Sequence, residues 1–584
     1  MRKINKKIVN FVPLDKRRFK SIYLISLFII TCLSIRVLNL QFLKSSNFKF
    51  KAIAMQNKRI NAINSRRSIV DKNNRLIAFD KPLYRLWAHP KYFNFPGDSY
   101  RTIRTIDEVV DKLSKALNID KEVLNSKFNN YEGGVKLFDE LNEEDSKKIK
   151  NLHISGLDLE LYSKRFYPQG HLYSNIVGFV NDENIGSAGL ELHLDEKINI
   201  LNKSNILKKG GDGTPLPDSS GPKDFVSDDQ KIILTIDSRL QKITFDVLVK
   251  QVKEWKAKKG FAMVMNVNNG EILSLVSAPS YDPNEFWKYD QSLFKGWYMQ
   301  DLFEPGSTFK PINLAMALEA KVVDKNGFVQ DDGNIKVGGW NLYNWNKKGN
   351  GYINYPEVLQ VSSNIGMIKI MQKLHPANHW EWLNKLGINK KIDTDLYEST
   401  PGYLKSKDIF VNQPIEQAVA SFGQGFSISP LKLAQIHAIL ANGGYEIIPH
   451  VTQDFKIEDK KNKKNKLFSS EVSKTILEWM ETVVENGTGN GSKIDGYRIG
   501  GKTGTSQKAI NGIYTTKKVC SFVATLPIND PKYLVLVVVD EPSKAYAYGS
   551  TVAVPVAKEI IESLIVLEKI PPSSKENKII VKKP

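Results

Sequence analysis

Cysteine is nearly absent from this sequence, and its two cysteines are far apart. Cys32 lies in an apolar N-terminal segment and Cys520 lies near the other end of the 584-residue chain, so a disulfide framework is excluded and both thiols are expected to be free. Metal-binding patterns are missing as well, because the eight histidines form no His-Glu-x-x-His arrangement and no Cys-x-x-Cys pair occurs. We therefore expect chemistry that uses neither a metal ion nor another cofactor.

Motifs for nucleic-acid recognition are also missing, although the formal net charge is +20. Lysine and arginine are spread over the whole chain, and many lie in Lys/Asn-rich stretches such as 460–466. Such runs are typical of solvated loops. We expect no nucleic-acid partner, and the charge favours attraction to acidic cell-wall polymer or anionic lipid instead.

Long apolar runs are scarce, and the clearest one covers residues 22–40. Eight Lys or Arg residues and one acid precede it within the first twenty residues. Its length suits the hydrocarbon core of a bilayer, and the basic flank predicts a cytoplasmic N-terminus. We expect a cytoplasmic tail over 1–20, a single transmembrane helix over 21–43, and the rest of the chain outside. A cleaved signal peptide is the alternative, but the small-residue pair Ala52 and Ala54 stands well beyond the apolar core.

The length of the chain and its 41% hydrophobic content predict several domains with large cores. Residues 44–225 alternate short strands and helices, carry no catalytic motif, and end in the Gly/Ser/Pro-rich stretch 210–222. A second domain is expected over 229–567, and a Lys/Pro/Ser-rich tail over 568–584. Local patterns in the second domain predict a strand at 231–236, a helix from Asp237, a hairpin of 261–267 and 271–277, helices within 353–386 and 430–442, and strands at 497–505, 518–525 and 533–540.

A serine and a lysine three residues apart, Ser307 and Lys310, follow the turn signal Pro305-Gly306. Ser307 is predicted to begin a helix, and residues i and i+3 of a helix share a face. The Lys310 amine should therefore lie beside the Ser307 hydroxyl. A nearby amine can act as base for an alcohol only if burial or a second cation keeps that amine neutral.

Two later motifs complete the set, Ser362-Ser363-Asn364 and Lys502-Thr503-Gly504-Thr505, and Lys502 is the candidate second cation. Ser-x-x-Lys occurs five times in the chain, so that pattern alone is typical of surface pairs, whereas Lys-Thr-Gly occurs once. Order and context distinguish the set, because a helix start is followed by a Ser-Ser-Asn loop and then by Lys-Thr-Gly in a strand-like run. The three motifs together predict a serine acyl-transfer site.

These motifs and their surroundings resemble the class B penicillin-binding proteins, which are peptidoglycan D,D-transpeptidases. The likeness to their transpeptidase domain rests on EPGSTFKP at 304–311, SFGQGF at 421–426, GKTGT at 501–505 and DEP at 540–542. RFYP at 165–168, GFV at 178–180 and GLE at 189–191 resemble the same family's membrane-proximal domain. The residues beside the Ser-x-x-Lys motif and the Ser-Gln-Lys at 506–508 are most similar to the division-specific branch.

The resemblance implies the penicillin-binding transpeptidase fold, which is α+β with a mostly antiparallel sheet and helices on both faces. An elongated α+β pedestal of the dimerisation type would precede it, after one transmembrane helix. Among the catalytic residues, Ser307 would attack a stem peptide, Lys310 would take its proton, and Ser362 would relay a proton to the leaving amine.

The resemblance also implies the substrate-binding residues Asn364, Lys502, Thr503, Gly504 and Thr505. Asn364 would hold the substrate amide and the Lys310 amine, and Lys502 would add positive charge. Thr503 and Thr505 would bind the substrate carboxylate. The backbone N–H groups of Ser307 and Thr505 would form the oxyanion hole.

The chain departs from the family pattern where the extracytoplasmic domain begins. The family usually has glycine at the positions of Arg67 and Asn74, so the geometry of the pedestal there is open. Asparagine tolerates a positive φ better than other non-glycine residues, which makes Asn74 a suitable replacement. Arg67 is expected to alter the local backbone.

The expected function is peptidoglycan cross-linking for septal wall synthesis in cell division, at the bacterial inner membrane with the catalytic domain periplasmic. The expected partners are peptidoglycan stem peptides, β-lactam antibiotics, a membrane glycan polymerase and division-complex proteins.

Two alternative functions are an elongation-specific transpeptidase and a membrane-anchored serine β-lactamase. A β-lactamase needs a base that activates water, and no motif supplies one. A β-lactam sensor would need a cytoplasmic output domain, which twenty residues cannot form, and a scaffold without activity would not need three intact motifs.

Overall fold

The computed structural model divides the chain into two units, Met1–Ile63 with Leu201–Ser227 and Asn64–Ile200 with Asp228–Pro584. The small-residue pair at 52 and 54, the stretch 210–222, residues 460–464 of the basic run and residues 574–584 of the predicted tail lie outside the described residues. The structure describes residues 16–45, 48–49, 51, 57–59, 65–93, 104–128, 134–200, 206–208, 231–455, 465–510 and 513–573.

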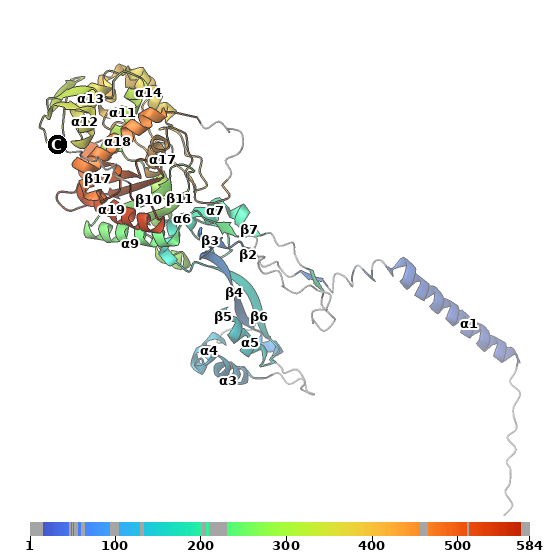
Figure 1. Ribbon diagram of the computed structural model, residues 1–584. Helices are drawn as coiled ribbons and strands as arrows, with labels where there is room; N and C mark the ends of the chain where they lie inside the picture. Colours follow the sequence, from blue (N-terminus) through green and yellow to red (C-terminus); the bar gives the residue numbers. More distant parts are fainter. Residues whose placement is uncertain are drawn as a thin grey trace, which may run out of the picture. The chain divides into compact units, whose positions relative to one another are not determined.

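The first unit contains the predicted apolar helix as α1 (Lys16–Leu38), which continues into a π-helical turn at Asn39–Leu43. The helical segment Lys16–Phe42 is long and apolar enough to cross a membrane by length and composition. The short strands β1 (Asn57–Arg59) and β8 (Ile206–Lys208) pair antiparallel in the same unit. The helix predicted over 21–43 is thus present (Figure 1).

The pedestal is built around the long strand β4 (Leu76–Ala88), which pairs with β3, β5 and β6. A hydrophobic cluster that includes Val109, Leu113 and Leu137 packs helices α3 to α5 against one end of β4. The remaining elements are β2 (Ser65–Arg66), β3 (Ile69–Val70), α3 (Ile106–Leu117), α4 (Lys121–Phe128), β5 (Val135–Leu141), α5 (Glu143–Lys150), β6 (Leu157–Phe166), α6 (Ser174–Val177), α7 (Gly189–His193), α8 (Asp195–Ile198) and β7 (Asn199–Ile200).

A buried ionic cluster joins three parts of the pedestal that are distant in sequence. The carboxylate of Glu191, which is fully buried, accepts hydrogen bonds from Arg66 Nε at 2.8 Å and from Arg165 Nε at 2.7 Å. Arg165 also pairs with Asp80 at 3.0 Å. Buried charges are tolerated only when paired and hydrogen-bonded, so this cluster fixes the relative positions of β2, β4, β6 and α7.

The two positions without the family's glycine differ in their backbone conformation. Asn74 has φ +62°, so the expectation that asparagine replaces glycine in a left-handed conformation is confirmed. Arg67 is not among the residues with positive φ, and its backbone N–H donates to Ile198 O at 2.9 Å. The backbone at Arg67 therefore does not need glycine.

The segment after β3 also contacts the second domain, near the start of its first long helix and just after its last helix. The Asp71 carboxylate accepts hydrogen bonds from the backbone and the hydroxyl of Ser238, in the first turn of α9 (Ser238–Glu254). Lys72 Nζ pairs with Asp237 at 3.3 Å and with Glu568 at 2.7 Å, just after α19 (Gly549–Leu567). Residues 71 and 72 thus hold the first and last helices of the second domain.

The second domain is centred on a five-stranded antiparallel sheet with the strand order β11-β10-β18-β17-β16. Helices α9 and α19 cover one face, and α11, α17 and α18 cover the other (Figure 1). The elements of this domain are β9 (Ile232–Ile233), α9, β10 (Lys259–Asn266), β11 (Ile272–Ala278), α10 (Trp297–Gln300), α11 (Lys310–Glu319), β12 (Phe328–Asp331), β13 (Asn334–Val337), β14 (Trp340–Tyr343), β15 (Gly351–Asn354), α12 (Tyr355–Gln360), α13 (Asn364–Met371), α14 (Pro376–Lys385), α15 (Lys407–Asn412), α16 (Pro414–Ala420), α17 (Pro430–Ala441), α18 (Ser470–Asn486), β16 (Gly500–Ile510), β17 (Ile513–Leu526), β18 (Tyr533–Asp540) and α19.

Alternate residues of the central strands enter two separate cores. In β10, Phe261 and Met263 pack on the side of α11, α17 and α18, whereas Ala262 and Val264 pack on the side of α9 and α19. Successive side chains of a strand point to opposite faces, and a sheet covered on both faces needs apolar residues at every position. This explains the continuous apolar runs and confirms the predicted antiparallel sheet between helix layers.

Several predicted boundaries move in the structure. The strand predicted at 497–505 begins at Gly500 and continues to Ile510, because the polar stretch 506–509 pairs with β17 although it has no apolar alternation. The predicted hairpin of 261–267 and 271–277 is confirmed, with Gly270 at φ +87° in its turn. Asp237 caps α9 by accepting from Arg239 N at 2.9 Å, as expected for the start of that helix.

Candidate active site

Ser307 lies in a 3₁₀ turn, Gly306–Phe309, and the α-helix α11 begins only at Lys310. The prediction that Ser307 is the first residue of the helix is therefore off by one turn. Pro311 accounts for the shift, because proline fits the first turn of an α-helix, where its missing N–H is not needed. The Ser307 hydroxyl is half-buried, and no hydrogen bond joins it to another residue that the structure describes.

Two buried amines meet at the Ser362 side chain. Lys310 and Lys502 are both fully buried, and their Nζ atoms lie 3.2 Å and 3.0 Å from Ser362 Oγ. Lys310 Nζ also lies 2.7 Å from Ser362 O and 2.8 Å from Asn364 Oδ1. A neutral amine has two N–H donors and one lone pair, which suits these two acceptors and one hydroxyl donor.

The electrostatics favour a neutral Lys310. Burial lowers the pKa of Lys310 well below its ordinary value, the charge of Lys502 lowers that pKa further, and Asp331 opposes both effects. Burial also lowers the pKa of Lys502, to about 7. Two ammonium groups beside one hydroxyl repel each other, so the proton that the pair retains near neutral pH resides on Lys502.

The backbone of Ser362 is left-handed, with φ +55°. The next residue, Ser363, caps α13 by accepting from Gly366 N at 2.8 Å. A non-glycine residue in this conformation is strained by about 1–3 kcal/mol and persists only where its surroundings enforce it. Here the helix cap on one side and the two amines on the other hold the Ser362 hydroxyl between them.

A buried carboxylate behind the Ser-Ser-Asn loop was not foreseen from the sequence. Asp331, at 1% exposure, accepts from Ser363 Oγ at 2.7 Å and from Asn344 Nδ2 at 2.8 Å. Asn344 Oδ1 in turn accepts from Asn364 N at 2.8 Å. Asp331 and Asn344 thus orient both ends of the motif, and the 32 positions between Asp331 and Ser363 left no local signal of this contact.

Strand β16 carries the Lys-Thr-Gly motif directly against the 3₁₀ turn. A Cβ on Gly504 would lie 2.9 Å from the Thr308 side chain and 2.4 Å from Ser521 Oγ, so only glycine allows this approach. Thr503 Oγ1 bonds Thr488 Oγ1 at 2.6 Å, and the exposed Thr505 accepts from a backbone N–H at 2.9 Å. The structure therefore brings residues of all three motifs together, with Lys310 and Lys502 at Ser362 and Lys310 at Asn364, but no hydrogen bond links the Ser307 hydroxyl to the Lys310 amine.

The arrangement can perform acyl transfer, because it combines a hydroxyl, a neutral amine one turn later, and a second hydroxyl hydrogen-bonded to two amines. The same surroundings contain one further polar residue of interest, Glu304, three positions before Ser307. The Glu304 carboxylate accepts from Gly425 N at 2.9 Å and from the Tyr514 hydroxyl at 3.0 Å. The motif around Ser307 included this glutamate, but nothing in the sequence indicated its contacts.

Two family models match the chain over the regions that hold these sites. Residues 260–562 match the penicillin binding protein transpeptidase domain, and residues 62–213 match the penicillin-binding protein dimerisation domain.

Similar proteins extend over most of the chain. A peptidoglycan D,D-transpeptidase FtsI homolog of Mesostigma viride is 38% identical, covering 92% of this chain and 94% of that protein. The peptidoglycan D,D-transpeptidase FtsI of Buchnera aphidicola is 28% identical, covering 98% and 99%. A peptidoglycan synthetase structure from Bifidobacterium adolescentis has a TM-score of 0.67 at 22% identity, covering 88% and 97%, and shows likeness of fold.

The matched domains, the extent of these similarities and the three motifs assembled around Ser362 lead to one conclusion: the chain belongs to the penicillin-binding protein transpeptidase family, with the dimerisation domain of that family before its transpeptidase domain.

Proposed function

We propose that this chain is a peptidoglycan D,D-transpeptidase that cross-links stem peptides through an acyl-enzyme on Ser307. The observation that carries the proposal is the pair of buried amines beside the Ser362 hydroxyl. One of them, Lys310, lies one turn after Ser307. In acylation, Ser307 Oγ attacks the carbonyl of the penultimate D-alanine and its proton passes to the neutral Lys310 amine. Ser362 then delivers a proton to the amine of the departing D-alanine.

The substrate-binding roles follow from the positions around this centre. Asn364 offers its amide to the peptide backbone while its oxygen stays on Lys310. Thr503 and Thr505 offer hydroxyls to the terminal carboxylate, whose charge Lys502 attracts. The backbone N–H groups of Ser307 and Thr505 stabilise the oxyanion, a contribution of about 3–4 kcal/mol per donor in other acyl-transfer enzymes. The amine of a neighbouring stem peptide then takes the acyl group and restores Ser307.

We assign the enzyme to septal wall synthesis in cell division. The Ser-Gln-Lys at 506–508 and the residues beside the Ser-x-x-Lys motif support this assignment, as do the relatives named FtsI. A membrane glycan polymerase and division-complex proteins are the proposed partners, and β-lactams the proposed inhibitors. We place the domains at 1–20 (tail), 21–43 (membrane helix), 44–225 (pedestal), 229–567 (transpeptidase) and 568–584 (tail).

The acylated residue can be identified with a fluorescent penicillin. Label should map to the peptide containing Ser307, and Ser307→Ala should abolish labelling because the nucleophile is lost. Ser292 is exposed and also precedes a lysine by three positions, so Ser292→Ala is the matched control and should label normally. Label retained by Ser307→Ala would contradict the assignment.

The rate of acylation should fall on acidification. Since the neutral form of Lys310 is the base and burial holds its pKa well below the ordinary value, protonation removes the base as the pH falls through that lowered pKa. Lys310→Arg should acylate at least about a hundredfold more slowly, because guanidinium stays charged. Stopped-flow measurement with penicillin tests both. Lys432 is another buried lysine with a lowered pKa, and Lys432→Arg should keep the rate; an equal loss in the two variants would refute the role of Lys310.

Asp331→Asn should change both the rate and its pH dependence. Removing the carboxylate charge lowers the pKa of Lys310 further, so the acid limb of the pH profile should move to lower pH. The lost hydrogen bonds should reduce the maximal rate about tenfold. Asp395 is a comparably buried carboxylate that accepts from Val451 N and Thr452 N, and Asp395→Asn should leave the profile in place. A profile of Asp331→Asn that matches the wild type or moves to higher pH would rule out the electrostatic role.

We further propose that α1 remains as an anchor in the inner membrane, with the N-terminus cytoplasmic and the catalytic domain periplasmic. The length and composition of the helix and the basic residues before it support this topology. Alkaline phosphatase fused after Pro584 should be active in a bacterial host, and the same enzyme fused after Arg18 should be inactive. A mature N-terminus near residue 55, or an inactive fusion at Pro584, would exclude it.

A further inference from the structure

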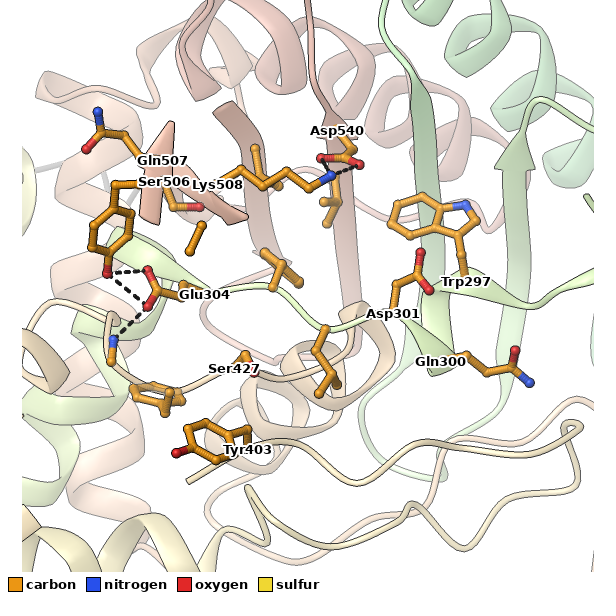
Figure 2. Close-up of a pocket in the computed structure, with 18 of the residues that line it drawn as sticks. Trp297, Gln300, Asp301, Glu304, Tyr403, Ser427, Ser506, Gln507, Lys508 and Asp540 are labelled. Atoms are coloured by element: carbon orange, nitrogen blue, oxygen red, sulfur yellow. Dashed lines mark hydrogen bonds and ion pairs between the residues drawn. The ribbon is translucent and has the colours of Figure 1, made fainter. Parts of the chain in front are cut away.

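A cavity of about 760 Å³ lies beside the 3₁₀ turn Gly306–Phe309, which contains Ser307, at the hairpin end of β16. Its wall includes Glu304 and Ser506, and a Cβ on Gly306 would lie 3.3 Å from the Ser506 side chain. The cavity therefore lies beside the turn that contains Ser307, although Ser307 itself is not among the residues that line it. Figure 2 shows Glu304 at one side of this space and Trp297 and Asp301 at the other.

Most charged groups that line the cavity have a partner of opposite charge. Lys259 and Lys295 both pair with Asp301, and Lys508 pairs with Asp540 at 2.7 Å. Lys405 bonds Glu416. These groups already satisfy one another and need no ligand.

Glu304 differs, because no cationic side chain that the structure describes lies within 4.0 Å of its carboxylate. Its partners are neutral donors, namely Gly425 N at 2.9 Å, the Tyr514 hydroxyl at 3.0 Å from both oxygens (Figure 2), and the side chain of Gln424. Burial raises the pKa of Glu304 above its ordinary value, and the charge of Lys405 lowers it in part. A half-buried carboxylate without a counter-ion is a favourable place for a cation.

The remaining walls suit an aliphatic chain that carries the cation. Phe426 and the ring of Tyr403 form one side, and Val519 and Val538 contribute apolar surface from the sheet. Pockets that bind small groups combine such walls with a few placed polar atoms. Apolar walls beside a carboxylate suit a flexible methylene chain that ends in an ammonium group.

We propose that this cavity binds the ammonium-bearing side chain of the diamino acid in a stem peptide, with Glu304 as its counter-ion. The inference rests on the proposed function, since it places a part of that enzyme's peptide substrate. A stem peptide can supply this group from two sources. The donor peptide presents it next to the D-alanine that acylates Ser307. The acceptor peptide presents it as the group that removes the acyl group, once the ammonium has given one proton to the Glu304 carboxylate and has become a neutral amine.

Binding can be tested without catalysis in the full-length Ser307→Ala protein in detergent. The probes are two synthetic pentapeptides that end in D-Ala-D-Ala, one with a free lysine at the third position and one with that lysine Nε-acetylated. The free peptide should bind about tenfold more tightly, and Glu304→Gln in the same background should remove this preference, because a charged hydrogen bond is lost. An equal affinity for the two peptides in the Ser307→Ala protein would overturn the proposal.

Catalysis with Ser307 restored distinguishes the two sources. If the donor occupies the cavity, Glu304→Gln should reduce the kcat/KM for D-alanine release from the free peptide about tenfold relative to the acetylated one. If the acceptor occupies the cavity, the acyl-enzyme is formed from the acetylated peptide and the free-lysine peptide is then added as acceptor. In Glu304→Gln, about tenfold less of this acyl-enzyme should become cross-linked product than in the protein that retains Glu304. Either result supports the ammonium site. If Glu304→Gln reduced the rates with the free and the acetylated peptide by the same factor, Glu304 would only hold the turn and the hairpin in place. That result would overturn the proposal.

Two further variants separate charge from structure. Asp301→Asn removes a carboxylate of the same cavity that two lysines already neutralise, so it should keep the preference for the free peptide. Tyr514→Phe removes the hydroxyl that bonds Glu304 but keeps the carboxylate, so the preference should persist there too. A failure of the proposed function would appear separately, as absence of penicillin label on Ser307, and would leave the binding measurement valid.

Discussion

The burial of two amines beside one hydroxyl is the constraint on which the rest of the active site depends. Lys310 and Lys502 both contact Ser362 Oγ from positions without solvent exposure, and an ammonium group in such a place is unstable unless it is compensated. The repulsion between the two and their shared desolvation lower the pKa of Lys310. The neutral amine is thereby favoured, which is the form that the proposed role of Lys310 as a base requires.

The fold supplies this burial from elements that are far apart in the chain. Lys310 begins α11, Ser362 precedes α13, and Lys502 lies on β16, an end strand of the sheet. The close contact of Gly504 with Thr308 brings the strand against the 3₁₀ turn that contains Ser307. The two hydrophobic cores on either side of the sheet keep these elements in place, since alternate residues of β10 anchor the sheet in both.

Short-range patterns in the sequence predicted much of this arrangement. The hairpin around Gly270, the capping role of Asp237 and the helical neighbourhood of Ser307 and Lys310 depend on residues within a few positions of each other, where spacing has direct physical meaning. The extent of β16 and the contacts of Asp331 were not predictable in this way. The first depends on pairing with β17 across polar residues, and the second on a hydrogen bond between residues 32 positions apart.

The contacts of residues 71 and 72 have a mechanical consequence. Asp71 bonds the start of α9 and Lys72 pairs with Glu568 after α19, and these two helices cover the same face of the catalytic sheet. A force applied to the pedestal would therefore load this helix layer where α9 starts and α19 ends, two points that lie together because Lys72 pairs with both Asp237 and Glu568. Tension along the chain would then reach the sheet that carries β16 through the helices α9 and α19 that pack on it.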